Sequence, residues 1–247
     1  KTVSKDDIET LLKDKFRLER YVDDAFKSEF FKIKPQEKPE YNGLQLIFRA
    51  VIINMAKQLL VNDAKLAPIT VYGMEWDKAS RQVISSDGQA IVQIGGKIDR
   101  LDIVDDGTLP KPMLRIVDYK TKASANDEKA VSLEHLFLHN TDHPAYIFQT
   151  FLYCTVMSDY LRKKGEVDAY QISPNLFYVA KSSPDDYSPV VKLGKEEVKD
   201  FSIYEREFLL RLENLLGEIF NPEIPFEPTT REETCMWCDF KNLCNKK

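Results

Sequence analysis

The chain has 247 residues, of which 43% are hydrophobic and 30% are charged, a balance typical of a soluble globular protein. Its apolar stretches stay below 18 residues and no secretory signal opens it, so the sequence predicts neither a membrane span nor secretion. The net charge of −5 excludes a protein that is basic all over, so a surface for nucleic acid would have to be local. Residues 162–164 and Lys241 with Lys246 and Lys247 are such local basic runs, although each alone is more often a solvated face.

Residues 1–66 are expected to form a helical N-terminal part. Residues 6–26 have apolar side chains at helical spacing, and Ser4 followed by acids is a helix-start signal. A break at residues 38–43 precedes a long, nearly apolar segment at residues 44–66. We expect that segment to be a buried helix.

Residues 67–221 are expected to form the main domain. Three β-rich segments, at residues 68–77, 89–107 and 113–120, are separated by a turn signal at 85–88 and a loop at 105–112, which predicts an antiparallel meander. The Gly95–Gly96 pair indicates a bulge or a close backbone approach. Then follow a helix from Pro144 to Gly165, strand-like segments at 167–180 and 187–194, and an amphipathic helix at 195–221. This order predicts an α/β or α+β domain with one mixed sheet.

The third β-rich segment ends in an acid and an amine. Strand side chains alternate between faces, so Asp118 and Lys120 share one face, and the hairpin can bring Asp99 or Asp102 across from Asp118. Adjacent carboxylates repel unless a divalent cation such as Mg²⁺ or Mn²⁺ lies between them. A nearby lysine can then activate water and offset charge on a phosphate. The alternative is an ordinary surface ion pair between Asp118 and Lys120, and this alternative would be preferred if the D-x-K motif were the only evidence.

Four motifs in order resemble the PD-(D/E)XK nucleases, specifically the RecB/AddB-type exonuclease branch. They are GGKIDRLD at 95–102, LRIVDYKTK at 114–122, QTFLY at 149–153 and CMWCDFKNLC at 235–244. The resemblance covers most of the chain and implies a restriction-endonuclease-like core, in which a mixed central sheet with a three-strand antiparallel meander is flanked by helices.

The resemblance also implies roles for individual residues. Asp99 and Asp118 would hold Mg²⁺ or Mn²⁺ with the Tyr119 carbonyl, and Lys120 would position the attacking water. Gln149 and Tyr153, which share one helical face, would assist. The alternative for Gln149 is a surface amide or one that packs between helices, and the alternative for Tyr153 is an aromatic residue of the core. Glu75 is either a supporting acid or a plain strand-edge carboxylate, and the two interpretations are evenly balanced.

Residues 222–247 form a tail that is rich in proline and then in cysteine. By the resemblance, Cys235, Cys238 and Cys244 would bind part of a [4Fe–4S] cluster; structural Zn²⁺ and unliganded thiols are the alternatives. The fourth cysteine of such a cluster should precede the nuclease motifs, but Cys154 is instead expected to be a buried small hydrophobe.

The metal-site histidine that the family usually has upstream is missing too, because His135, His139 and His143 all follow Lys120. We therefore expect the chain, which begins at Lys1, to be the C-terminal piece of a longer protein.

The sequence thus predicts a cytoplasmic, metal-dependent DNA nuclease domain. It would hydrolyse phosphodiester bonds of single-stranded DNA exonucleolytically in recombination or repair. No phosphate-binding G-x4-GK-[ST] loop is present, so the helicase would lie elsewhere in the longer chain or in a partner. Two alternatives are a DNA-binding or structural module with an incomplete nuclease site, and a metal hydrolase that acts on another phosphoester.

Overall fold

The structure is a computed structural model of the whole chain. It describes residues 1–105, 107–121, 129–138, 144–183, 185–225, 227, 229, 231–236 and 238–245.

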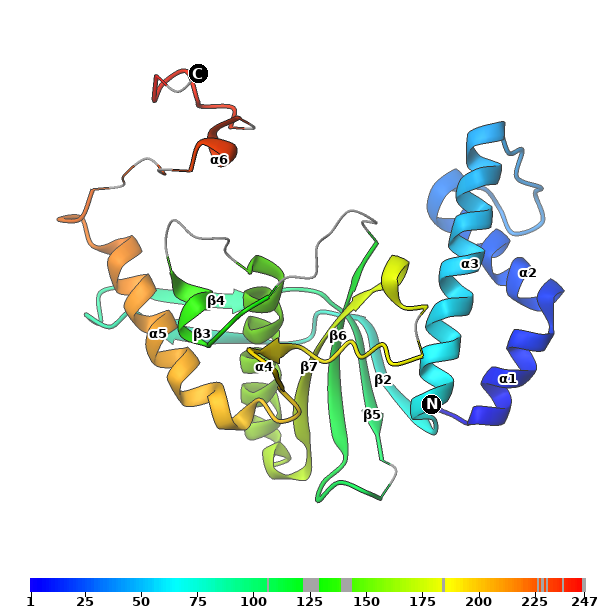
Figure 1. Cartoon of the computed structure of the whole chain (residues 1–247), viewed down its shortest axis with the longest axis horizontal. Helices are drawn as coiled ribbons and strands as arrows, with labels where there is room; N and C mark the ends of the chain where they lie inside the picture. Colours follow the sequence, from blue (N-terminus) through cyan, green and yellow to red (C-terminus); the bar gives the residue numbers. More distant parts are fainter. Residues whose placement is uncertain are drawn as a thin grey trace.

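A five-stranded mixed sheet forms the centre of the molecule (Figure 1). Its strands follow the order β1 (Thr2–Val3), β2 (Ile69–Trp76), β5 (Ile98–Val104), β6 (Met113–Lys120) and β7 (Gln171–Tyr178). Strands β2, β5 and β6 pair antiparallel, whereas β7 pairs parallel to β6. The predicted fold class, a mixed sheet containing a three-strand meander, is therefore confirmed.

The meander is interrupted by a hairpin that the sequence analysis did not predict. Strands β3 (Ser80–Ile84) and β4 (Ile91–Gly95) form a separate two-stranded sheet. The predicted turn at residues 85–88 joins them, with Gly88 at a φ of 73°. The prediction of one strand over residues 89–107 was wrong, because the chain leaves β4 at Gly95–Gly96 and enters the central sheet only at Ile98.

Helices cover both faces of the central sheet (Figure 1). On one face lies α4 (Ala145–Lys164), whose apolar residues, Phe151 and Met157 among them, share the main core with Leu114 and Ile116 of β6. As predicted, α4 starts after Pro144 and ends at Gly165, which has a φ of 74°.

Helix α5 (Ser202–Phe220) packs outside α4, and the short α6 (Glu232–Met236) lies beyond it in the tail. Helix α5 begins later than predicted, because residues 192–193 and 196–197 instead form the small β8 (Lys192–Leu193) and β9 (Glu196–Glu197) hairpin.

The N-terminal part adds strand β1 to the edge of the sheet and then forms helices. The capping box of Ser4 with Asp7 starts α1 (Lys5–Lys13), as the sequence indicates. The predicted single helix over residues 6–26 breaks at Asp14, whose side chain accepts from the Arg17 amide and caps α2 (Lys15–Ala25). A π-helical segment, Phe26–Phe31, follows.

The expectation that residues 44–66 are buried was wrong. They form α3 (Gly43–Leu66), which covers the sheet face opposite α4 and contacts the Val117–Phe177 cluster through Met55 and Leu59. The first half of α3 leaves Leu44, Ile47 and Phe48 at least half exposed. By length and composition α3 could also cross a membrane, and only 6% of its most apolar window is buried. One such helix is weak evidence of a membrane span.

Candidate active site

The β5–β6 hairpin places Asp99 beside Asp118. The antiparallel strands pair Leu101 with Ile116. Asp99, two residues before Leu101, therefore lies opposite Asp118, two residues after Ile116, and both are on the face covered by α4. The Tyr119 amide donates to Asp99 Oδ2 at 2.8 Å, which holds this carboxylate across the hairpin. Asp118 is buried, with 5% of its surface exposed.

Asp102, the other residue that the sequence allowed opposite Asp118, lies on the opposite face. It is fully buried and accepts two hydrogen bonds from Arg115, at 2.6 and 2.8 Å, while Arg100 Nε forms an ion pair with it at 2.6 Å. Arg100 also donates to Asp63 of α3 at 2.6 Å. Burial lowers the pKa of Arg100, but the charges of Asp102 and Asp63 outweigh that effect and raise it overall. This network fastens α3 to the sheet.

The Lys120 ammonium lies at the centre of a row of polar contacts. Its Nζ is 2.5 Å from Asp118 Oδ2 and donates to Gln149 Oε1 at 3.5 Å. The Gln149 amide in turn donates to the Tyr153 hydroxyl at 2.9 Å. The structure therefore brings Gln149 of the Q-x3-Y motif to the lysine and Tyr153 to Gln149.

One residue of this site was missed by the sequence analysis. The Tyr146 ring lies beneath Lys120 Nζ, 4.0 Å from its centroid, a cation–π contact. Tyr146 is three residues before Gln149 on α4, so helical spacing would have placed both on one face.

The acidic pair has the chemistry of a site for a hard cation. Burial raises the pKa of Asp118, the close Lys120 ammonium lowers it, and the charge of Asp99 raises it again, so the net shift is upward. In the described part of the chain, Asp118 Oδ2 accepts no hydrogen bond of good geometry, and Lys120 is its ionic partner.

Mg²⁺ commonly binds proteins through one or two carboxylates and completes its shell with water and phosphate oxygens. Asp99 and Asp118 fit that requirement. Among the described residues no group of three or more His, Cys, Asp or Glu side chains gathers to hold a metal.

Glu75 lies on the strand next to Asp99, but its side chain is not directed to the Asp99–Asp118 pair. Strand β2 pairs Met74 with Arg100 and Trp76 with Ile98, so Glu75 lies across from Asp99. Its carboxylate instead forms an exposed ion pair with Lys97 at 3.2 Å. Glu75 has a φ of 47°, a conformation that non-glycine residues seldom adopt and that often accompanies a functional site.

The Gly95–Gly96 pair makes a close backbone approach, as the sequence indicates. A Cβ on Gly96 would lie 2.9 Å from Cε1 of Tyr153. The absence of a side chain at this position therefore lets the link between β4 and β5 rest on the tyrosine ring.

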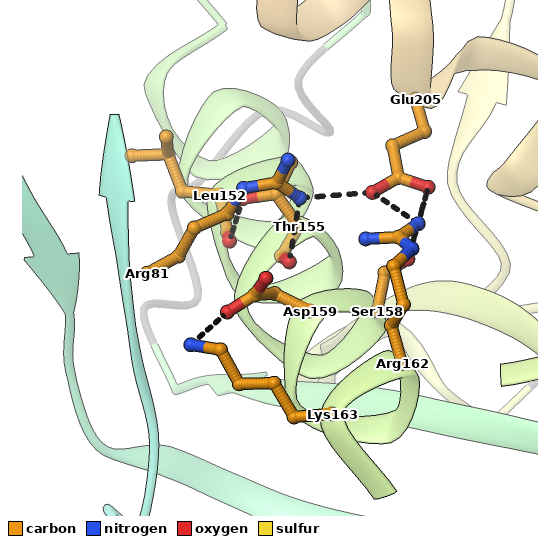
Figure 2. A network of polar contacts seen from close by, with 8 residues as sticks. All are labelled: Arg81, Leu152, Thr155, Ser158, Asp159, Arg162, Lys163 and Glu205. Carbon is orange, nitrogen blue, oxygen red and sulfur yellow. Dashed lines mark hydrogen bonds and ion pairs between the residues drawn. The ribbon is translucent and has the colours of Figure 1, made fainter. Parts of the chain in front are cut away.

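A buried ion network fixes α4, the helix that carries Gln149 and Tyr153 (Figure 2). Glu205 of α5 accepts from Arg81 of β3 at 2.9 Å, and from Ser158 and Arg162 of α4 at 2.9 and 3.0 Å. Only 13% of the Glu205 side chain is exposed, so its own charge is poorly screened, whereas 47% of the Arg162 side chain reaches solvent. The network clamps α4 between the β3–β4 hairpin and α5.

The four cysteines and His135 take no part in the contacts described above. Cys154 is fully buried in the main core, and burial raises the pKa of its thiol well above the ordinary value, which confirms the expected small hydrophobe. Cys235 is buried at α6, Cys238 is partly exposed and Cys244 is exposed; all four thiols are free. His135 lies in a 3-10 turn (Glu134–Phe137), whereas His139 and His143 fall outside the described residues, as do Lys246 and Lys247.

Comparison with known proteins identifies one family. The family model described as PD-(D/E)XK nuclease superfamily matches residues 2–245. A search of curated proteins finds no match.

Proposed function

The chain belongs to the PD-(D/E)XK nuclease superfamily, and from that premise we propose that it is a metal-dependent deoxyribonuclease that hydrolyses phosphodiester bonds. The observation that carries the proposal is the cluster on one sheet face, in which Asp99, Asp118 and Lys120 meet Gln149 and Tyr153 of α4. A hydrolase needs a cation site and a positioned water beside the scissile phosphate, and this cluster has side chains for both.

Each residue has a role in this proposal. Asp99 and Asp118, with the Tyr119 carbonyl, would hold Mg²⁺ or Mn²⁺, which supplies Lewis-acid stabilisation of the phosphate when bound. The Lys120 ammonium orients the attacking water and offsets the negative charge that develops on the phosphate oxygens. Gln149 holds Lys120 in place and is itself held by Tyr153. Glu75 is a supporting acid, which would have to leave Lys97 to take part.

We further propose that the enzyme digests single-stranded DNA exonucleolytically, coupled to a helicase in the same longer chain or in a partner subunit. The order of the hairpin, Q-x3-Y and cysteine motifs supports this branch of the superfamily. In the intact protein Cys235, Cys238 and Cys244 would bind a [4Fe–4S] cluster with a fourth ligand from outside these residues. The free thiols are compatible with a reducing cytoplasm.

Digestion of end-labelled single-stranded DNA tests the proposal. We expect cleavage with Mg²⁺ or Mn²⁺, none with a chelator, and none with Lys120→Ala. Glu75→Gln is a useful companion variant. The Glu75 carboxylate points to Lys97, so we expect this variant to lose less of the cleavage rate than Lys120→Ala does. Equal rates for the wild type and Lys120→Ala would contradict the mechanism.

A DNA-binding or structural module with an incomplete nuclease site is the second candidate. It is favoured by one observation, that no histidine precedes the hairpin. Calorimetric titration with Mn²⁺ separates the two candidates. Binding that disappears in Asp118→Asn supports the nuclease, and no binding to the wild type supports the module.

A further inference from the structure

A groove of about 540 Å³ runs beside the candidate active site on the same face of the sheet. In the parallel pair of β6 and β7, Leu176 is the partner of Asp118 and Tyr178 is the partner of Lys120, and both β7 residues line the groove. Partners in a parallel pair point to the same face, and neighbouring strands lie about 4.8 Å apart. The groove therefore begins about one strand width from Asp118 and Lys120.

The lining of this groove is basic although the chain is acidic. Lys129, Lys181 and Lys192 line it together with a single acid, Asp186. Lys192 has an ion pair with Glu197, but at 3.8 Å and with its side chain 53% exposed, so that pair is weak.

The lysines come from separate segments that the fold brings together. The Gly194 amide donates to the Ala130 carbonyl at 2.8 Å, which joins the segment of Lys129 to that of Lys192. Lys181 ends a 3-10 turn (Val179–Lys181) directly after β7.

Aromatic side chains accompany these charges. Lys181 Nζ lies 5.9 Å from the centroid of the Tyr178 ring. Tyr187, which also lines the groove, is partly exposed, and its hydroxyl accepts from the Tyr178 amide at 2.8 Å. A positively charged groove that follows the backbone is the feature by which proteins attract single-stranded nucleic acid without sequence preference.

A second groove adjoins the site on its other side and lacks this charge. It encloses about 620 Å³ between β3 and the Gly95–Gly96 link, and its charged lining residues are one lysine, Lys78, and one acid, Asp77. It offers no net attraction to a phosphate backbone.

We propose that the groove lined by Lys129, Lys181 and Lys192 binds the phosphodiester backbone of a single DNA strand on one side of the bond to be cut. The proposal rests on the proposed nuclease function and adds to it where the strand lies. The three lysines contact phosphates of the strand.

Binding without cleavage tests this. The affinity of the whole chain for fluorescently labelled oligothymidine is measured in chelator by anisotropy, as a function of salt. We compare the wild type with the triple variant Lys129→Ala, Lys181→Ala, Lys192→Ala. The matched control triple is Lys5→Ala, Lys15→Ala, Lys32→Ala, which removes the same charge from exposed ion pairs on the N-terminal helices.

For the groove triple we expect at least about fivefold weaker binding and a log–log salt slope that is shallower by roughly 2, since each phosphate contact on a single strand contributes about 0.7. The control should stay within about twofold of the wild type. Replacing the same three lysines by arginine should restore both affinity and slope. If the alanine triple loses its circular dichroism spectrum, Lys181→Ala alone decides, with an expected slope change of about 0.7.

Two results would overturn the proposal: an unchanged affinity and slope in the groove variants, or an equal loss in the groove and control triples. Neither depends on cleavage, so the proposed function is judged separately by Lys120→Ala. If Lys120→Ala is inactive while the groove triple binds normally, the nuclease proposal stands and the groove proposal fails.

Discussion

Replacing Asp102 and Asp99 by asparagine separates a structural carboxylate from a proposed functional one. The two aspartates are three residues apart on β5 but face opposite sides of the sheet. Asp102→Asn removes the carboxylate charge that pairs with Arg100 Nε and with Arg115 Nε, each at 2.6 Å, and all three residues are buried. Asp99→Asn keeps an oxygen that can still accept from the Tyr119 amide.

The expected magnitudes differ widely. Removing one partner of a buried ion pair typically costs about 3–5 kcal/mol, because a charge is left uncompensated. Asp63 still pairs with Arg100 at 2.6 Å, so we expect about 3 kcal/mol for Asp102→Asn. In a chain of this length that corresponds to a fall in Tm of roughly 6–12 °C. For Asp99→Asn we expect less than about 1 kcal/mol, because the hydrogen bond is kept.

Urea denaturation and thermal unfolding measure the stability of both variants, and calorimetric titration with Mn²⁺ measures the site. Asp102→Asn should be much less stable yet bind Mn²⁺ while folded, whereas Asp99→Asn should be stable and not bind it. An Asp102→Asn variant as stable as the wild type, or an Asp99→Asn variant that binds Mn²⁺ normally, would refute this assignment of the two faces.

Two further predictions concern the surroundings of the site, and a third concerns the contact between Asp23 of α2 and Arg49 of α3. Gln149→Leu leaves Lys120 without its amide acceptor, so the single-turnover cleavage rate should fall about 10- to 100-fold at unchanged stability; an unchanged rate would remove Gln149 from the site. Glu205→Gln removes the charge that joins β3, α4 and α5, and urea denaturation should show a loss of about 1–3 kcal/mol, whereas no loss would mean that the clamp does not hold α4. The hydrogen bonds of Arg49 lower the pKa of Asp23, against the raising effect of burial and with help from Tyr41. The stability that Asp23 gains from this is present above its ordinary pKa of 3.8 and is lost as pH falls through the lower folded value, so the stability difference between the wild type and Asp23→Asn should shrink only below pH 3.8.

Local patterns predicted the side-chain alternation of β6 and the extent of α4. Alternation alone placed Asp118 and Lys120 on one face, and the Pro144 and Gly165 signals gave both ends of α4. The choice between Asp99 and Asp102 was not readable, because it depends on the register of the hairpin, and a shift of one residue turns every side chain to the other face.

The burial of α3 was mispredicted for a different reason. An apolar helix is normally covered all round, but α3 meets the sheet mainly through its second half, near Met55 and Leu59. How far a helix extends past a sheet is decided by tertiary packing rather than by its composition. The β3–β4 hairpin was missed likewise, because the Gly95–Gly96 pair reads as a bulge within one strand as readily as a break between two.

The central claim is that Asp118 and Lys120 perform metal-dependent hydrolysis of DNA. The most direct test is the single-turnover rate of cleavage of end-labelled DNA at saturating enzyme, with Mg²⁺, for the wild type, Asp118→Asn and Lys120→Ala. We predict cleavage by the wild type that stops when a chelator is added, and a loss of at least about 1000-fold in each variant, the scale expected when a main source of transition-state stabilisation is removed. Cleavage by either variant at the wild-type rate would contradict the account.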